Sequence, residues 1–341
     1  MSVITFNDFA RQGEEIVSLR RQLDEHRMVH ALLITGENGA GKKTLAGLVA
    51  EALMCKADTN IPCGACSGCR LAQSGEHPDI TIVTKGTPLT RDTSKGKNNI
   101  PVDDIREIIR ICSLYSLEGG NRAVIIQNAE DMTFQAQNSL LKILEEPPQN
   151  TYFILTSSHP DQLLPTVISR CRPVKLIPWD KEYIQKVLEC EGADPVKSKK
   201  AAEASYGSIG YAKKLITDDQ YWKTQEDILD AFFRNRKRSR ILNISQNWKD
   251  RKSEADTLFD ILEQHVRILL NCRLHPGSEQ TIRDYPAEWQ RFSQSAPLER
   301  FTFLYDKICE ARKQMSFNVN FQAVVEQLLL AFIGESEIWV Q

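Results

Sequence analysis

The sequence predicts an α/β fold built on a parallel sheet, followed by an all-helical C-terminal part. Short apolar runs of strand length alternate with helical periodicity in the first half of the chain, which is typical of a parallel sheet covered by helices on both faces. A glycine-rich segment separates the first of these runs from the first helix. After Pro178 the strand signals fade and helical periodicity dominates.

The strands are predicted where apolar runs end at turn residues. Residues 31–35 (ALLIT) form a continuous apolar run that stops at Gly36, as a buried parallel strand does. Further runs of the same character predict the remaining strands, at 79–83, 122–127, 152–157 and 173–178.

Helices are predicted between these strands at 42–54, 101–112 and 134–146. The last of them ends at the Pro147-Pro148 pair, since proline cannot continue a helix. The first helix carries apolar residues at the spacing of one helical face, namely Leu45, Leu48, Val49, Ala52 and Leu53.

The C-terminal part is predicted to be helical throughout. Residues 180–217 read as short helices around a glycine-rich turn at 207–210, and helical periodicity continues from about 219 to 334. Near the end an apolar stripe repeats at helical spacing. Periodicity does not distinguish an intramolecular core from a face that packs on another subunit. The stripe consists of Phe321, Val324, Val325, Leu328, Leu329 and Phe332.

Composition excludes several classes of protein. With 341 residues we expect two or three domains. Lys and Arg (43) nearly balance Asp and Glu (45), so no overall field draws the chain to nucleic acid or membranes. Any DNA contact must therefore use a local patch or the charge of partners. The sequence contains no apolar run of the roughly 18–20 residues that span a bilayer, and its first residues lack the apolar stretch that is typical of a signal peptide. We expect a cytoplasmic protein.

Residues 36–44 (GENGAGKKT) follow the phosphate-binding pattern G-x-x-x-x-G-K-[ST] with one departure. Gly36, Gly41 and Lys42 match it, with Gly39 between them, and would place backbone N–H groups and an ammonium around phosphates. Lys43 occupies the position of the hydroxyl that ligates Mg²⁺. Thr44 follows one residue late, about 100° further round the helix. We expect a P-loop fold without Mg²⁺ binding and with impaired hydrolysis. The sequence does not decide whether ATP or ADP binds. The alternative is a glycine-rich turn that binds nothing.

The strand that should carry catalytic acids ends in amides. P-loop ATPases place an Asp for Mg²⁺, often followed by a catalytic Glu, at the end of a buried strand. In this chain Gln127 and Asn128 follow that strand, and neither balances the charge of Mg²⁺ nor accepts a proton from water. Glu130 and Asp131 come later and are expected to begin the next helix. The sequence thus predicts a nucleotide-binding fold without working catalysis in cis.

A cluster of cysteines predicts a zinc site. Cys55, Cys63, Cys66 and Cys69 have the spacing C-x7-C-x2-C-x2-C, which lets thiolates close a tetrahedral shell. Such a full shell leaves no open position, so the predicted zinc is structural. The alternatives are unliganded thiols or a redox pair. The other cysteines are interpreted as small core residues, namely Cys112, Cys171, Cys190, Cys272 and Cys309.

Several segments together carry a family resemblance. They are HALLITGENGAGKKTLA (30–46), the cysteine insertion behind it, NSLLKILEEPP (138–148) and Ser169-Arg170-Cys171. The chain resembles the delta-prime family of bacterial DNA polymerase III clamp-loader subunits, which are AAA+ proteins related to gamma/tau. The resemblance covers most of residues 1–178, and the helical tail shares it chiefly through 318–332. The first cysteine spacing is one residue shorter than the family's.

The resemblance implies three domains. These are a RecA-like AAA+ P-loop domain at 1–178 with a zinc module at 55–69, a small helical lid at 179–218, and an all-α collar at 219–341. It also implies that Arg170 is an arginine finger, which reaches the ATP of a neighbouring subunit. In the lid, Gly210 stands where such proteins normally present an Arg to their own nucleotide.

The function implied is that of a non-hydrolysing subunit in a hetero-pentamer with gamma/tau and delta subunits, at the nucleoid-associated replisome. The complex would open the sliding clamp and load it on primer–template DNA. Arg106 and Arg110, and the polar loop 84–99, are candidate DNA contacts, with an ordinary solvated surface as the alternative. Two rival functions stay open: an active gamma/tau-type ATPase, and a zinc-containing nucleic-acid-binding module with a vestigial P-loop.

Overall fold

The computed structural model describes residues 4–58, 61–86, 89, 99–113, 120–235, 237–275, 282, 285–317 and 319–338. Its contacts divide the chain into two units, Met1–Thr217 and Asp218–Gln341. The division into three domains stays a prediction.

A five-stranded parallel sheet forms the centre of the first unit, so the predicted fold class is confirmed. The last strand ends at Lys175, earlier than predicted, because its partner ends at Thr35, where the chain turns into the glycine-rich loop. In the order β2-β3-β4-β1-β5, the strands are β1 (Ala31–Thr35), β2 (Ile80–Val83), β3 (Arg122–Ile126), β4 (Thr151–Ser157) and β5 (Arg172–Lys175).

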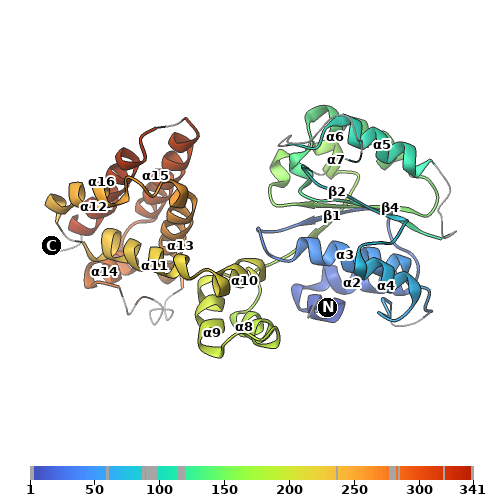
Figure 1. Ribbon diagram of the computed structural model, residues 1–341, viewed down its shortest axis with the longest axis horizontal. Helices are drawn as coiled ribbons and strands as arrows, with labels where there is room; N and C mark the ends of the chain where they lie inside the picture. The colour runs from blue at the N-terminus through green and yellow to red at the C-terminus, as the bar shows by residue number, and fades with distance from the viewer. Residues whose placement is uncertain are drawn as a thin grey trace. The chain divides into compact units, whose positions relative to one another are not determined.

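Helices cover both faces of this sheet (Figure 1). One face carries α2 (Glu14–Asp24), α3 (Lys42–Met54) and α4 (Ser67–Ser74), with the short α1 (Phe6–Phe9) beside them. The other face carries α5 (Val102–Cys112), α6 (Phe134–Glu145) and α7 (Pro165–Ile168). Single 3-10 turns complete the connections, at Ala10–Gln12, Ala129–Asp131 and Pro160–Gln162.

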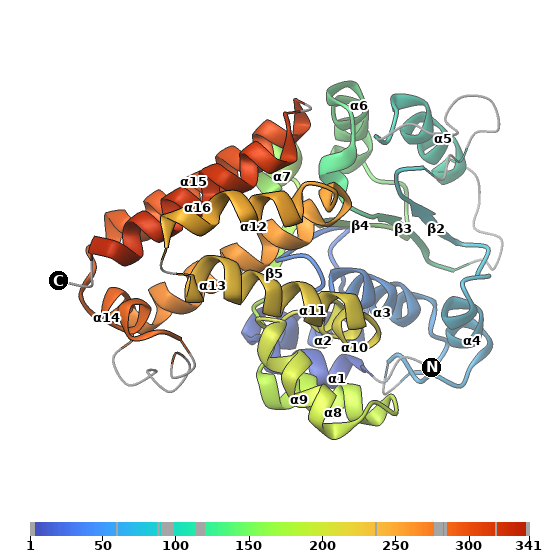
Figure 2. The same cartoon turned by 60° about the vertical axis from the view of Figure 1, so that its left-hand side comes forward.

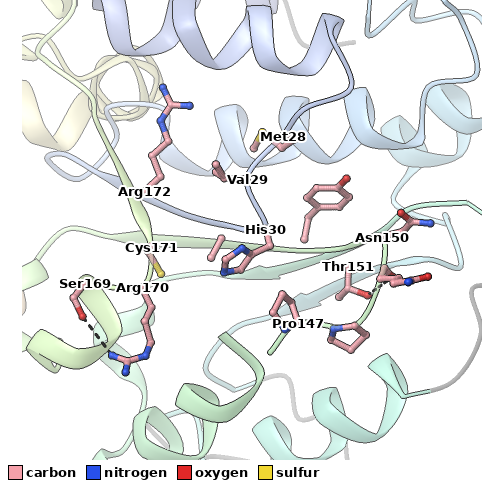
Figure 3. Close-up of a pocket in the computed structure, with 14 residues that line it drawn as sticks. Met28, Val29, His30, Pro147, Asn150, Thr151, Ser169, Arg170, Cys171 and Arg172 are labelled. Atoms are coloured by element: carbon pink, nitrogen blue, oxygen red, sulfur yellow. Dashed lines mark hydrogen bonds between the residues drawn. The ribbon is translucent and has the colours of Figure 1, made fainter. Parts of the chain in front are cut away.

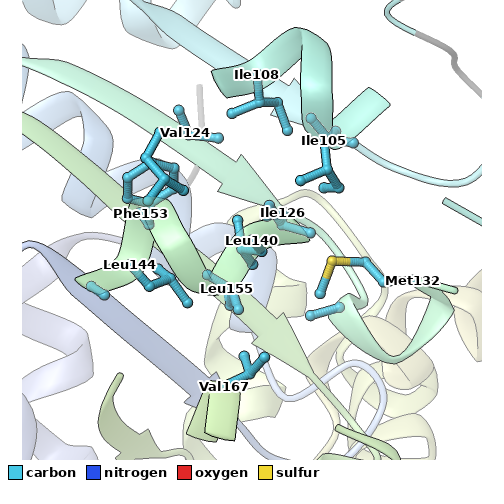
Figure 4. Close-up of a cluster of buried hydrophobic side chains, with 14 of the residues drawn as sticks. Ile105, Ile108, Val124, Ile126, Met132, Leu140, Leu144, Phe153, Leu155 and Val167 are labelled. Carbon is cyan, nitrogen blue, oxygen red and sulfur yellow. The ribbon is translucent and has the colours of Figure 1, made fainter. Parts of the chain in front are cut away.

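The core between the sheet and the second set of helices is fully buried (Figure 4). Because α6 and α7 share this core with the strands, the loops at their ends have fixed positions. The side chains that Figure 4 shows include Ile105 and Ile108 from α5, Leu140 and Leu144 from α6, Val167 from α7, and Val124, Ile126, Phe153 and Leu155 from the strands.

Three short helices follow the sheet within the same unit. They are α8 (Lys181–Cys190), α9 (Pro195–Ala204) and α10 (Ile209–Thr217), and we call residues 179–217 the lid. Asp194 caps the start of α9, and its carboxylate accepts hydrogen bonds from the N–H groups of Val196 and Lys197. This is the capping arrangement that stabilises a helix N-terminus.

The second unit is helical throughout its described residues. In Figure 2, α12, α15 and α16 lie side by side. The apolar stripe predicted at 321–332 is buried inside this unit, so it forms an intramolecular core. The helices are α11 (Asp219–Ile228), α12 (Ile241–Trp248), α13 (Ala255–Leu274), α14 (Ala287–Ser295), α15 (Leu298–Ser316) and α16 (Phe321–Ile338), with shorter turns at Leu229–Arg234, Arg238–Arg240 and Lys252–Glu254.

None of the described helices combines the length and the apolar composition that crossing a membrane requires.

Candidate nucleotide and metal sites

The glycine-rich loop joins β1 to α3, as a P-loop does. Gly36, Gly39 and Gly41 have φ angles of 149°, 76° and 101°. At Gly39 the positive φ disfavours a side chain, and an added Cβ would also collide with the hydroxyl of Ser208. The loop therefore keeps the backbone path of a phosphate-binding turn and lies directly against the lid.

Lys42 is buried at the start of α3, and its ammonium is satisfied by the protein. Its Nζ donates to the carbonyls of Gly36 and Glu37 and to Ser158 Oγ, each at 2.8 Å. Burial lowers the pKa of Lys42, opposed by the negative charge of Glu130 and assisted by the positive charge of Lys43. An ammonium has three N–H donors, so a phosphate must displace one of these partners to be bound.

The two residues after Lys42 differ in exposure. Lys43 is exposed, whereas Thr44 is half-buried on the first turn of α3. The impaired Mg²⁺ site stays a prediction.

Glu130 lies at the site, contrary to the prediction that it begins the next helix. Residues Ala129–Asp131 form a separate 3-10 turn, and α6 begins only at Phe134. The turn brings Glu130 back to the sheet, where its Oε1 accepts the N–H of Ser158 at 2.9 Å. The sequence prediction assigned this acid to the start of a helix, because a short turn after a strand has no periodicity to reveal it. Gln127 and Asn128, at the strand end itself, are both half-buried.

The lid closes over the glycine-rich loop. Ser208 Oγ donates to the carbonyl of Asn38 at 3.0 Å, and the N–H of Gly210 donates to the carbonyl of Gly39 at 3.0 Å. The indole N–H of Trp179 donates to the carbonyl of Ala40 at 2.8 Å.

The cavity between the loop and the lid is correspondingly small. It measures about 10 Å³ and is lined by residues that include Glu37, Pro178 and Gly207. That volume holds about one water molecule, whereas ligand pockets measure about 300–1,000 Å³. A nucleotide therefore does not fit into this cavity with the lid in the position that the structure shows.

The four predicted zinc ligands converge at the end of α3. Cys55 caps α3, Cys63 lies in the following loop, and Cys66 and Cys69 lie at the start of α4. Their Sγ atoms all lie within 4.8 Å of one another, and Cys63 Sγ and Cys69 Sγ are 3.9 Å apart. Tetrahedral zinc with Zn–S bonds of about 2.3 Å requires sulfurs about 3.8 Å apart. The residues thus fit the metal, Cys55 included.

The five other cysteines do not all lie in the core. Cys112, Cys171 and Cys272 are buried, as predicted, whereas Cys190 and Cys309 are exposed, contrary to the prediction.

Backbone N–H groups lower the pKa of the Cys66 thiol, whereas burial raises the pKa of the Cys55 and Cys69 thiols. The N–H groups of Lys56 and Cys69 point at Cys66 Sγ, at 3.5 and 3.4 Å. Although burial opposes ionisation, these bonds lower the pKa of the Cys66 thiol to about 6. A thiolate is the form that binds zinc. The sequence did not predict α4, because this short helix is built around two of the cysteines.

Arg170 and the glycine-rich loop lie at opposite ends of the parallel strands: the loop follows the C-terminal end of β1, and Arg170 precedes the N-terminal end of β5. It lies two residues before β5 and lines a cavity of about 550 Å³ with His30 and Asn150, which precede β1 and β4 (Figure 3). The glycine-rich loop follows the other end of β1. A five-residue strand separates its two ends by roughly 15 Å. Arg170 therefore cannot reach a phosphate bound in its own loop.

The candidate DNA contacts on α5 are exposed but paired. Arg106 forms an ion pair with Asp103 at 3.2 Å, and Arg110 forms one with Glu107 at 2.6 Å. Residues 87–88 and 90–98 of the predicted basic loop lie outside the described residues.

Comparison with known proteins gives consistent matches. A family model described as "DNA polymerase III, delta subunit" matches residues 11–180. The chain is 30% identical to the DNA polymerase III subunit delta' of Escherichia coli K12, covering 88% of each chain. It is 26% identical to the same subunit of Bacillus subtilis 168, covering 92% of this chain and 93% of that one. The tau subunit of E. coli is 30% identical over 54% of this chain.

Among solved structures, a gamma subunit-related protein of Thermotoga maritima aligns over 95% of this chain, with 17% identity and a TM-score of 0.46.

Proposed function

The chain belongs to the delta-prime family of DNA polymerase III subunits, and we propose that it acts in a clamp loader as a subunit that does not hydrolyse ATP itself. In this proposal it assembles with gamma/tau and delta subunits in a cytoplasmic hetero-pentamer at the replisome. The complex loads the sliding clamp on primer–template DNA.

The observation that carries the proposal is the position of Arg170. Its side chain lies at the N-terminal ends of β1, β4 and β5, beside a cavity of about 550 Å³. Since it cannot serve its own loop, it is suited to the phosphate of a neighbouring subunit. A guanidinium there stabilises the charge that develops in phosphoryl transfer.

The cis site supports the same assignment. The lid contacts at Ser208 and Gly210 close the glycine-rich loop, and the Lys42 ammonium is already satisfied. Lys43, Gln127 and Asn128 replace the groups that would hold Mg²⁺ and activate water. We propose that this site has lost hydrolysis.

The zinc proposed at the cysteine cluster has a structural role. Four sulfurs complete a tetrahedral shell and leave no position for a substrate. The cluster ties the end of α3 to the start of α4, which stabilises the helix behind the glycine-rich loop.

DNA contacts are proposed to be shared across the assembled ring. The net charge of −2 gives the chain alone no strong attraction for DNA, and binding by the complex should depend strongly on salt.

One observation favours the alternative of an active gamma/tau-type ATPase. The Glu130 carboxylate lies beside Ser158, at the strand ends that the glycine-rich loop follows. Its negative charge raises the pKa of Lys42 against the effect of burial. This acid supplies a negative group that the strand end lacks.

The test is reconstitution of the complex from this chain and the gamma/tau and delta subunits of the same organism. DNA-stimulated ATP turnover is measured with wild type, Arg170→Ala and the matched control Arg70→Ala, an exposed arginine on α4 of the same unit. ATP turnover at the one site that Arg170 completes should fall by about 10³-fold. The total turnover of the complex should therefore fall by the fraction that this site contributes. Unchanged turnover would contradict the arginine finger, and turnover by the isolated chain would establish the alternative.

A further inference from the structure

We propose that Glu145 is a latch for Arg170, which holds the guanidinium on the subunit's own surface until the phosphate of a neighbouring nucleotide displaces it. This inference rests on the proposed function of Arg170 and adds a positioning residue that regulates it.

Every nitrogen of the Arg170 guanidinium is engaged within the subunit. Nε donates to Glu145 Oε1 at 2.8 Å, and a terminal nitrogen donates to the same oxygen. The other terminal nitrogen donates to the carbonyl of Thr166 at 2.9 Å and contacts Ser169 Oγ at 3.4 Å (Figure 3). Arg170 must therefore give up existing partners before it can bind a phosphate.

The latch is built on rigid elements. Glu145 ends α6, whose Leu140 and Leu144 are buried in the core shown in Figure 4. Arg170 follows α7, which is anchored in the same core through Val167. Because both helices are fixed, opening the latch needs only side-chain rotation, which is fast compared with turnover.

The chemistry of the pair suits an exchange. Carboxylate and phosphate oxygens compete for the same N–H groups, and the planar guanidinium matches both. While Glu145 is bound, its negative charge offsets the positive charge that Arg170 would present to a phosphate.

The pair is also weak enough to open. The two side chains are 33% and 50% exposed, and the exposed pair shifts an equilibrium by only about 1.4- to 5-fold. A polyphosphate carries more charge than one carboxylate and can therefore win the exchange.

The experiment compares Glu145→Gln with Glu146→Gln in the reconstituted complex. Glu146 is the exposed neighbouring residue, and the described contacts of Arg170 do not include it. Glutamine keeps the shape of the side chain and removes its charge. ATP turnover without DNA at the site that Arg170 completes should rise about 1.4- to 5-fold with Glu145→Gln and stay unchanged with Glu146→Gln.

Further arms separate a latch from a purely structural role. The difference between Glu145→Gln and wild type should shrink at high salt, because screening already weakens an exposed pair. It should also vanish in the Arg170→Ala background. Equal or lower turnover of Glu145→Gln, or a gain that survives Arg170→Ala, would overturn the latch. If Arg170→Ala alone changes nothing, the arginine finger itself fails; if it lowers turnover while Glu145→Gln matches wild type, only the latch fails.

Discussion

The hydrogen bond from Ser208 to the glycine-rich loop predicts that loosening the lid raises nucleotide affinity. The cavity of about 10 Å³ admits no nucleotide, so binding must wait for the lid to open. The apparent dissociation constant is then the intrinsic one divided by the open fraction. Ser208→Ala removes the bond to the Asn38 carbonyl and leaves the glycine backbone of the loop unchanged.

The magnitude follows from the bonds that hold the lid. A neutral hydrogen bond contributes about 0.5–1.5 kcal/mol net, which corresponds to about a 2- to 13-fold change in the open fraction. Ser208 Oγ also accepts the N–H of Tyr211 and so caps α10, and losing this cap loosens the lid in the same direction. We therefore expect ATP to bind Ser208→Ala at least 2- to 13-fold more tightly than wild type.

The assay is titration of the purified chain with a fluorescent ATP analogue. Ser205→Ala is the matched control, because this buried lid serine donates to Ala202 and does not contact the loop. The fluorescence of Trp179 gives an independent measure of lid opening, because its indole N–H is bonded to the carbonyl of Ala40 in the closed lid. Equal affinity of Ser208→Ala and wild type, with both folded by circular dichroism, would refute the closed-lid reasoning. Tighter binding by Ser205→Ala would show a general loosening instead.

Two further predictions concern the metal and a charged pair. Cys69→Ser should abolish stoichiometric zinc, measured by elemental analysis of the purified chain, whereas Cys112→Ser, a buried cysteine on α5, should retain it; zinc retained by Cys69→Ser would contradict the four-thiolate site. In the second unit, Arg251 holds the pKa of Glu254 below 4.5, so this pair stabilises the fold at neutral pH and the contribution is lost as pH falls below 4.5. Glu254→Gln should lower the midpoint of thermal unfolding at pH 7 and lower it progressively less as pH falls below 4.5, and an equal loss at neutral and acidic pH would exclude the ion pair as the cause.

Much of the sheet was predictable because each strand and helix there has a local signal. The run at 31–35 is apolar throughout and matches β1 in full, and the glycine-rich loop that follows it fixes the start of α3 at Lys42. Errors arose where a tertiary partner decides an end, as at β5, whose pairing with β1 stops at Lys175.

The functional sites divide in the same way. The cysteine cluster was predictable because its ligands lie within a short segment, so their spacing alone brings them together. The position of Glu130 beside Ser158 was not predicted, since only the turn at Ala129–Asp131 directs its side chain there.

By itself the sequence determined the α/β class, the glycine-rich loop, the cysteine cluster and the family, because all of these are written in local spacing or in aligned segments. The tertiary structure decided which distant groups meet. Ser208 reaches Asn38 across 170 residues, and Arg170 meets Glu145 across 25. Such contacts depend on how helices pack on the sheet, and packing is set by shape and burial summed over the whole core rather than by any local period.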